Sequence, residues 1–290
     1  MSSQEIQATE TSSDTRIATR RFNPFQILYD FMLILKAEFY RDLIFMKRYP
    51  LEPISFLFFM FMILIAIIYG IGTLTNSPDG QIPLNQERMI LGYCLMQFVM
   101  AAQMGWSGQI SNESQTGTLE QLSISGHSLG GVLLSRGVSQ FPRHVLSFFI
   151  LLVAFTYARD AKIHYTLSLV AIPVMFLAAF GIYGVAYVFA GLTLLFKRVG
   201  FFFQIINFGF LGLFWLDRGS LPDGSITATL YDIFPLTVGM ENLKDIFIQG
   251  ALPASIPALL ITSTASWALG YWAFRIMERK ARDLGLLSQY

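Results

Sequence analysis

Residues 165–196 read YTLSLVAIPVMFLAAFGIYGVAYVFAGLTLLF, which is 32 residues without an Asp, Glu, Lys, Arg or His. A helix needs about 20 apolar residues to cross the hydrocarbon core of a bilayer. This one stretch is therefore long enough to span a membrane. Four more charge-free stretches of sufficient length occur, over residues 53–78, 89–112, 199–216 and 246–274.

The composition of the whole chain agrees with this interpretation. Of the 290 residues, 54% are hydrophobic and only 13% are charged, against roughly a quarter charged in a typical soluble domain. This excludes a disordered chain and argues against an ordinary soluble enzyme, whose surface needs more charge. A net charge of +1 predicts no nucleic-acid partner. The single cysteine, Cys94, and three scattered histidines predict neither a disulfide nor a metal site.

A sixth span is predicted over residues 129–158, although Arg136 and Arg143 interrupt its first half. Its charge-free part, 145–158, is too short to cross alone, so we expect one long helix that protrudes from the membrane. The two arginines then either reach the interface or face a cleft lined by protein. The sequence thus predicts an all-α polytopic membrane protein with a single transmembrane domain over residues 22–290. Its predicted spans are 53–75, 89–111, 129–158, 165–195, 199–216 and 251–274.

The distribution of positive charge predicts the orientation of these spans. Six spans place both termini on one side, and a cytoplasmic side would then hold 15 of the 20 Lys and Arg residues. The other five are Arg88, Arg159, Lys162, Arg218 and Lys244. Cytoplasmic loops carry an excess of Lys and Arg. We therefore expect both termini in the cytoplasm and a multi-pass protein of the cell membrane, specifically a bacterial plasma or inner membrane.

Three segments outside the spans have distinct patterns. Residues 1–21 are rich in Ser, Thr, Gln and Glu, which predicts a disordered cytoplasmic tail. Residues 22–48 repeat apolar side chains every three or four positions with charges between them, which predicts an amphipathic helix in the cytoplasmic interface. Residues 217–250 are apolar but broken by Gly and Pro. This is typical of an extracellular re-entrant helical hairpin, whose backbone must be buried against protein.

The segment 112–126, between the second and third predicted spans, is short and begins with polar residues. Thr118 is placed to cap a short helix, and Glu120 and Gln121 fall in its first turn, where acceptors and negative charge stabilise it. A short helix that stands out of the membrane between two spans can receive force from a partner protein.

Residues 113–122, ESQTGTLEQL, closely resemble the coupling-helix motif of the ABC type-2 exporter permeases. That family also has an N-terminal interfacial helix, six spans, a hairpin before the last span and a basic tail like residues 275–290. The resemblance covers about residues 22–290. It departs at residues 125–127, which are Ser-Gly-His where family members often carry Pro. The residues that it implies for docking to the ATPase are Glu113, Gly117, Thr118, Leu119, Glu120, Gln121 and Leu122.

The resemblance implies the permease subunit of an ATP-driven exporter, working with a separate ATP-binding cassette subunit and a second permease chain in a homodimer or heterodimer. The chain has no G-x-x-x-x-G-K motif, so we expect no ATP hydrolysis, no catalytic residues and no cofactor in it. ATP and Mg²⁺ would bind to the partner ATPase. The apolar, Phe-rich interior predicts an amphipathic cargo, such as a drug, a lipid or a lipid-linked compound. A polysaccharide or lipid-linked glycan exporter of the same family, or an ATP-independent six-span carrier, remains an alternative.

Residues 126–130, GHSLG, match the nucleophile elbow G-x-S-x-G of the α/β-hydrolases. That chemistry needs an acid and then a histidine after the serine. Only Asp160 and His164 follow in that order, and the flanking segments are predicted spans rather than alternating strands and helices. We therefore interpret the motif as a turn that leads from the coupling helix into the third span.

Overall fold

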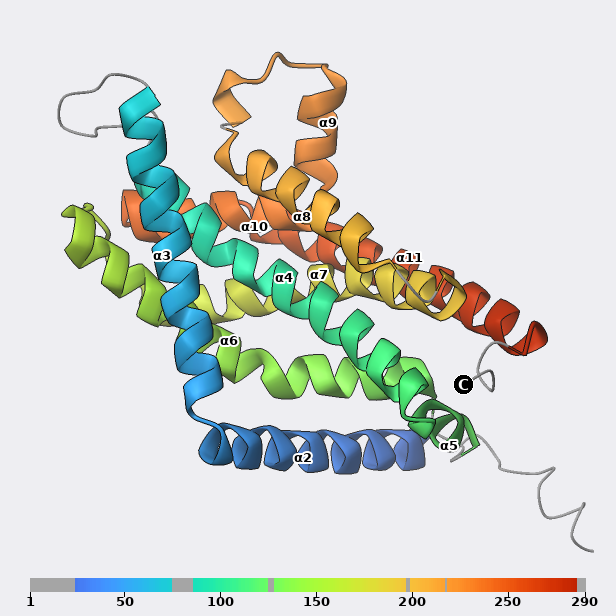
Figure 1. The fold of residues 1–290 in the computed structure, drawn as a ribbon. Helices are drawn as coiled ribbons and strands as arrows, with labels where there is room; N and C mark the ends of the chain where they lie inside the picture. The colour runs from blue at the N-terminus through green and yellow to red at the C-terminus, as the bar shows by residue number, and fades with distance from the viewer. Residues whose placement is uncertain (1–23, 75–85, 125–127, 197–198, 217, 286–290) are drawn as a thin grey trace, which may run out of the picture.

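The computed structural model describes residues 24–74, 86–124, 128–196, 199–216 and 218–285, and all regular structure within them is helical (Figure 1). The predicted all-α class is therefore confirmed, whereas the tail 1–21 lies outside the described residues. The first half contains α2 (Pro24–Arg48), α3 (Leu51–Leu74), α4 (Gln86–Gln115), α5 (Thr118–Ile124) and α6 (Leu129–Arg159). The second half contains α7 (Ser168–Phe196), α8 (Gly200–Trp215), η1 (Arg218–Ser220), α9 (Ile226–Ile233), α10 (Pro235–Lys244), the π-helix η2 (Asp245–Gln249) and α11 (Ile256–Asp283).

Among the described helices, α3, α4, α6 and α7 are long and apolar enough to cross a membrane. They correspond to the first four predicted spans, and α6 is one continuous helix as expected. Helix α8 has only 16 residues, which is below this length. Helix α11 is longer, but its Ser, Thr, Trp and Tyr residues lower its mean hydropathy. It also continues to Asp283, so much of the predicted tail 275–290 is helical.

Helix α4 forms the centre of the bundle and α3 its edge (Figure 1). In the apolar part of α4, 80% of the residues are buried, against 17% in α3. Helix α3 is attached through a hydrogen bond from the Tyr93 hydroxyl of α4 to the carbonyl of Met60, 2.9 Å long, and through the stacked rings of Phe61 and Phe155. A helix that is apolar and exposed on most sides is expected to face lipid or another chain.

Helices α7 and α11 pack with their backbones in contact at two glycines. A Cβ atom at Gly270 would overlap the carbonyl oxygen of Gly184, and one at Gly184 would overlap the backbone of Ser266. Close to this crossing, the Ser266 hydroxyl donates a hydrogen bond of 2.9 Å to the carbonyl of Gly181. Small residues and hydroxyl groups are the usual means of joining helices in membranes, where the hydrophobic effect does not drive helix association.

The first half of α6 is fixed to α7 by two tyrosines. Tyr183 and Tyr187 donate hydrogen bonds of 2.7 and 2.6 Å to the carbonyls of Gly137 and Gly130. The absence of a side chain at Gly137 allows α7 to approach, since a Cβ there would lie 3.1 Å from the Tyr183 ring, whereas a Cβ at Gly130 would lie 2.9 Å from the Tyr271 ring of α11. Ser128 caps α6, because its Oγ accepts a hydrogen bond from the backbone N–H of residue 131 at 3.1 Å. The serine of the hydrolase-like motif thus begins a helix.

Helices α9 and α10 form a helical hairpin that turns at Phe234, and Pro235 occupies the first turn of α10. Residues 235–240 of α10 are all buried, and the helix packs on α7, α11 and α4. Within the segment 217–250, for which a re-entrant hairpin is predicted, the structure has this pair of short helices, and the second is covered by the bundle.

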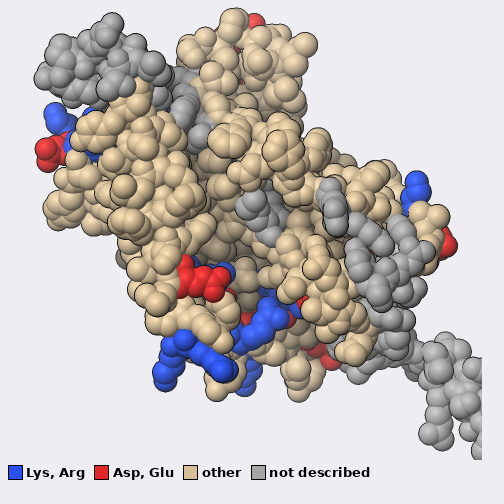
Figure 2. Space-filling model, in the orientation of Figure 1, with Lys and Arg blue, Asp and Glu red and all other residues tan. Residues whose placement is uncertain are grey.

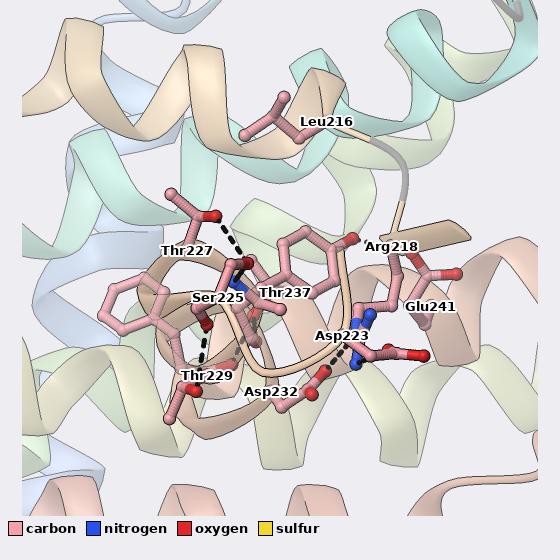
Figure 3. A network of polar contacts seen from close by, with 12 residues as sticks. Leu216, Arg218, Asp223, Ser225, Thr227, Thr229, Asp232, Thr237 and Glu241 are labelled. Carbon is pink, nitrogen blue, oxygen red and sulfur yellow. Dashed lines mark hydrogen bonds and ion pairs between the residues drawn. The ribbon is translucent and has the colours of Figure 1, made fainter. Parts of the chain in front are cut away.

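A polar network attaches this hairpin to the start of α4 and the end of α8 (Figure 3). The Arg88 guanidinium donates to the carbonyl of Leu216 at 2.7 Å, and to the Tyr231 hydroxyl and the Glu241 carboxylate at 2.6 Å each. Burial alone would raise the pKa of Glu241, but the hydrogen bonds from Arg88 and Tyr231 hold this pKa below its usual value. On the exposed side, Arg218 pairs with Asp232 at 2.8 Å.

Candidate functional site

Helix α2 has two acids, Glu38 and Asp42, turned toward α6, whereas its large apolar side chains are turned outward. Glu38 is buried, whereas Tyr29, Leu33 and Leu43 are each more than half exposed. Other large apolar side chains of α2, including Tyr40, are exposed as well. This is the reverse of a helix on the surface of a soluble protein. It fits a helix whose outer face lies among lipid chains and whose polar face meets the protein.

The buried acid of α2 contacts Arg136, in the first half of α6. The Arg136 guanidinium lies 3.0 Å from a Glu38 carboxylate oxygen through Nε and 2.6 Å from Glu113 of α4 through Nη2. Its Nη1 donates a longer hydrogen bond, 3.4 Å, to Gln109 of α4. We call Glu38, Gln109, Glu113 and Arg136 the Arg136 cluster. It joins three helices at one buried guanidinium, and of the two predicted positions for this arginine, the protein-lined one is present.

Two further ion pairs extend the contact between α2 and α6. Arg143 lies 2.9 Å from Asp42, one turn along α2 from Glu38, and Arg41 lies 2.6 Å from the second oxygen of Glu38. Burial raises the pKa of Asp42, and the nearby arginines Arg143 and Arg41 offset this only in part. Glu38 and Asp42 are thus both paired with arginines within the protein.

The segment 112–126, for which a coupling helix is predicted, includes the end of α4 at Gln115 and the start of α5 at Thr118. Gly117 adopts a positive φ of 72°, a conformation that a glycine reaches without strain. Thr118 bonds through its hydroxyl to Thr116 at 2.9 Å and to the Glu113 carbonyl at 3.3 Å. These bonds close the end of α4 and fix the direction of α5. Figure 1 shows α5 at the same end of the molecule as the first turns of α2 and α6.

The structure divides the predicted docking residues into two sets. Glu113 is engaged by Arg136, Leu119 is 3% exposed, and Leu122 packs against the core. Gly117, Thr118 and Gln121 are exposed, together with Gln115 and Thr116. The Glu120 side chain lies outside what the structure describes. We call Gln115, Thr116, Gly117, Thr118 and Gln121 the α5 surface.

Sequence reasoning named Glu113 for a charged contact with a partner protein and did not pair it with Arg136. A signal was nevertheless present. Two acids at i and i+4 on the α2 segment, and two arginines at i and i+7 in an apolar span, each place two charges on one helix face. Charges within a predicted span are expected to find partners in the protein. Spacing alone did not reveal that the two faces meet.

Figure 2 shows one face of the molecule with a middle region almost free of charge. Lys, Arg, Asp and Glu side chains gather at its lower edge, around α2, and at the far ends. Many large apolar side chains of the described residues are also exposed, which is not typical of a soluble monomer. Together with the four long apolar helices, it indicates a helical membrane protein.

Comparison with known proteins adds no relative to this description. The chain matches no protein-family model, and a search of curated proteins found no match.

Proposed function

We propose that this chain is the transmembrane permease subunit of an ATP-binding-cassette exporter, with α8 and α11 as its fifth and sixth spans. The proposal rests mainly on one arrangement: α5 has an exposed polar surface, and it follows directly on the Arg136 cluster, which connects the end of α4 to α2 and α6. A partner that pushes on α5 therefore acts on three helices at once. Both termini are cytoplasmic in this proposal, as the excess of Lys and Arg predicts.

Helix α8 needs support as a span because it is short. Its 16 residues rise about 24 Å, against a hydrocarbon thickness of roughly 30 Å. Its end is bonded to the start of α4 through Arg88 and the Leu216 carbonyl, 2.7 Å apart, and the two helices pack along each other. An antiparallel partner of full length therefore accompanies α8, and a short span is accommodated by local thinning of the bilayer.

In the proposed cycle, ATP binding draws two partner ATPase subunits together, and the α5 surface of each permease chain moves with them. The Arg136 cluster transmits this displacement to α2 and α6, because a buried guanidinium that holds two carboxylates resists separation. The spans then exchange inward and outward access as ATP biases the equilibrium. The cargo in this proposal is amphipathic, which suits the apolar interior of the bundle.

The test is affinity purification from native membranes, with mass spectrometry of partners and an ATPase assay. Gln121→Arg changes an exposed residue of the α5 surface, and Gln249→Arg makes the same change at an exposed position of η2. We expect a P-loop ATPase to co-purify with the wild type and the Gln249→Arg variant, and to be lost from Gln121→Arg. Absence of any ATPase in several mild detergents would overturn the proposal and leave the ATP-independent carrier.

A further inference from the structure

A groove lies between α2 and α6, beside the Arg136 cluster. None of the described residues that line it belongs to that cluster. Its volume is about 630 Å³, within the range of roughly 300–1,000 Å³ found for pockets that hold small ligands. The walls are almost entirely apolar. Among the described residues that line it are Tyr29, Met32, Leu33, Lys36 and Phe39 of α2 and Val138 of α6.

The charge of this groove is positive. Lys36 is the one charged residue among its described lining residues. The neighbouring acids Glu38 and Asp42 point to α6, where Arg136 and Arg143 neutralise them. An ammonium group at the border of an apolar groove matches a molecule with an acidic head and a hydrocarbon tail.

We propose that the groove binds one acidic phospholipid of the cytoplasmic leaflet, with an acyl chain against Leu33, Phe39 and Val138 and its phosphate near Lys36. The inference rests on the proposed function, which places α2 in the cytoplasmic interface. The walls are open to such a lipid, since Tyr29 is 67% exposed and Leu33 is 56% exposed.

The bound lipid would reinforce the contact that the Arg136 cluster makes. It touches α2 and α6 on the same stretch where Glu38 meets Arg136, because Lys36 and Phe39 flank Glu38 in the sequence and Val138 follows Arg136 by two residues. Filling the groove keeps the two helices together, so an acidic lipid would hold α2 in the position from which it follows α5.

The experiment is native mass spectrometry of the full chain in mild detergent, with phosphatidylglycerol and phosphatidylcholine added in equal amounts. We expect one tightly retained lipid, mostly phosphatidylglycerol. The variant Lys36→Gln loses one positive charge near the phosphate. It should lower the ratio of retained phosphatidylglycerol to retained phosphatidylcholine about fivefold. Lys47→Gln is the control, because Lys47 is an exposed base of the same helix that does not line the groove.

A second variant, Val138→Trp, fills the groove without changing its charge and should reduce retention of both lipids, with folding checked by size-exclusion chromatography. An unchanged lipid ratio in Lys36→Gln, or an equal decrease in Lys47→Gln, would overturn the proposal. A dimer that is lost in Val138→Trp would assign the groove to a second copy of the chain and would also overturn it. Lipid retention does not depend on an ATPase, so the pull-down described above fails or succeeds independently.

Discussion

Removing the guanidinium of Arg136 should destabilise the protein more than removing either of its acids. The Arg136 side chain is 7% exposed, and two carboxylates lie within 3.0 Å of it. At an effective dielectric constant of about 20, each pair at roughly 4 Å between charge centres is worth about 4 kcal/mol before the desolvation cost. Breaking a buried pair from one side typically costs about 3–5 kcal/mol, because a buried charge is left alone.

The substitution Arg136→Met takes the guanidinium away from Glu113 and leaves Glu38 with only the exposed Arg41, so we expect it to lower the free energy of unfolding by about 3–5 kcal/mol. Glu113→Gln leaves Arg136 paired with Glu38 and keeps a hydrogen-bonding group, so its effect should be about 1–2 kcal/mol. The assay is chemical unfolding of the detergent-solubilised protein, in a double-mutant cycle of Arg136→Met with Glu38→Gln.

The exposed pair Arg218–Asp232 is the matched control, with side chains 32% and 52% exposed. Exposed pairs contribute only about 0–1 kcal/mol. We expect a coupling energy above about 1 kcal/mol for Arg136 with Glu38, and a smaller one for the control cycle of Arg218→Met with Asp232→Asn. If the two coupling energies are equal, the Arg136 cluster is not a buried junction and the reasoning fails.

Three more predictions concern the rest of the bundle. Gly270→Leu should abolish the monodisperse peak in size-exclusion chromatography, because the new side chain would overlap Gly184 of α7. Gly209→Leu is the control and should keep the monodisperse peak, because a side chain at this position projects into open space. Tyr187→Phe should lower the free energy of unfolding by about 1 kcal/mol, since it removes one buried hydrogen bond to α6. The pKa of Glu241 is held below the usual 4.5, so its ionised form stabilises the fold above that pH and the benefit is lost as pH falls through the lower pKa of the folded state. The stability difference between wild type and Glu241→Gln, measured by unfolding from pH 7 to pH 3, should therefore shrink with acid; a constant difference would contradict it.

The predicted helices were obtained from length and hydropathy, and these signals are local. A charge-free run such as 165–196 has few stable conformations in a bilayer other than a helix, because each backbone group must find its partner within the same segment. The same logic anticipated α6 as one helix despite Arg136. The hydropathy signal is weaker for α11, because Ser, Thr and Tyr lower its mean hydropathy. In this helix, Gly270 and the Ser266 hydroxyl make close contacts with α7.

The contacts between helices could not be read in the same way. Glu38 and Arg136 are 98 positions apart, and their pairing depends on which faces of α2 and α6 meet. Apolar periodicity identifies a face of α2 but does not say whether it meets protein or lipid. In a soluble protein the apolar face would be buried, whereas in α2 it is exposed and the acids are inside. For the same reason Leu119, predicted to dock a partner, is buried in its own chain.

The choice of ions rather than apolar side chains at this junction has a physical consequence. Apolar contacts between α2 and α6 could slide by a turn with little change in energy, because hydrophobic burial is not directional. A guanidinium that holds carboxylates of two other helices has one arrangement that satisfies all three, and buried polar groups are best known for fixing the register of packed helices. The hydrogen bonds of Tyr183 and Tyr187 fix the opposite side of α6 to α7. The first half of α6 is therefore held on both sides, and in the proposed cycle a displacement of α5 would be carried into the bundle instead of being absorbed at its edge.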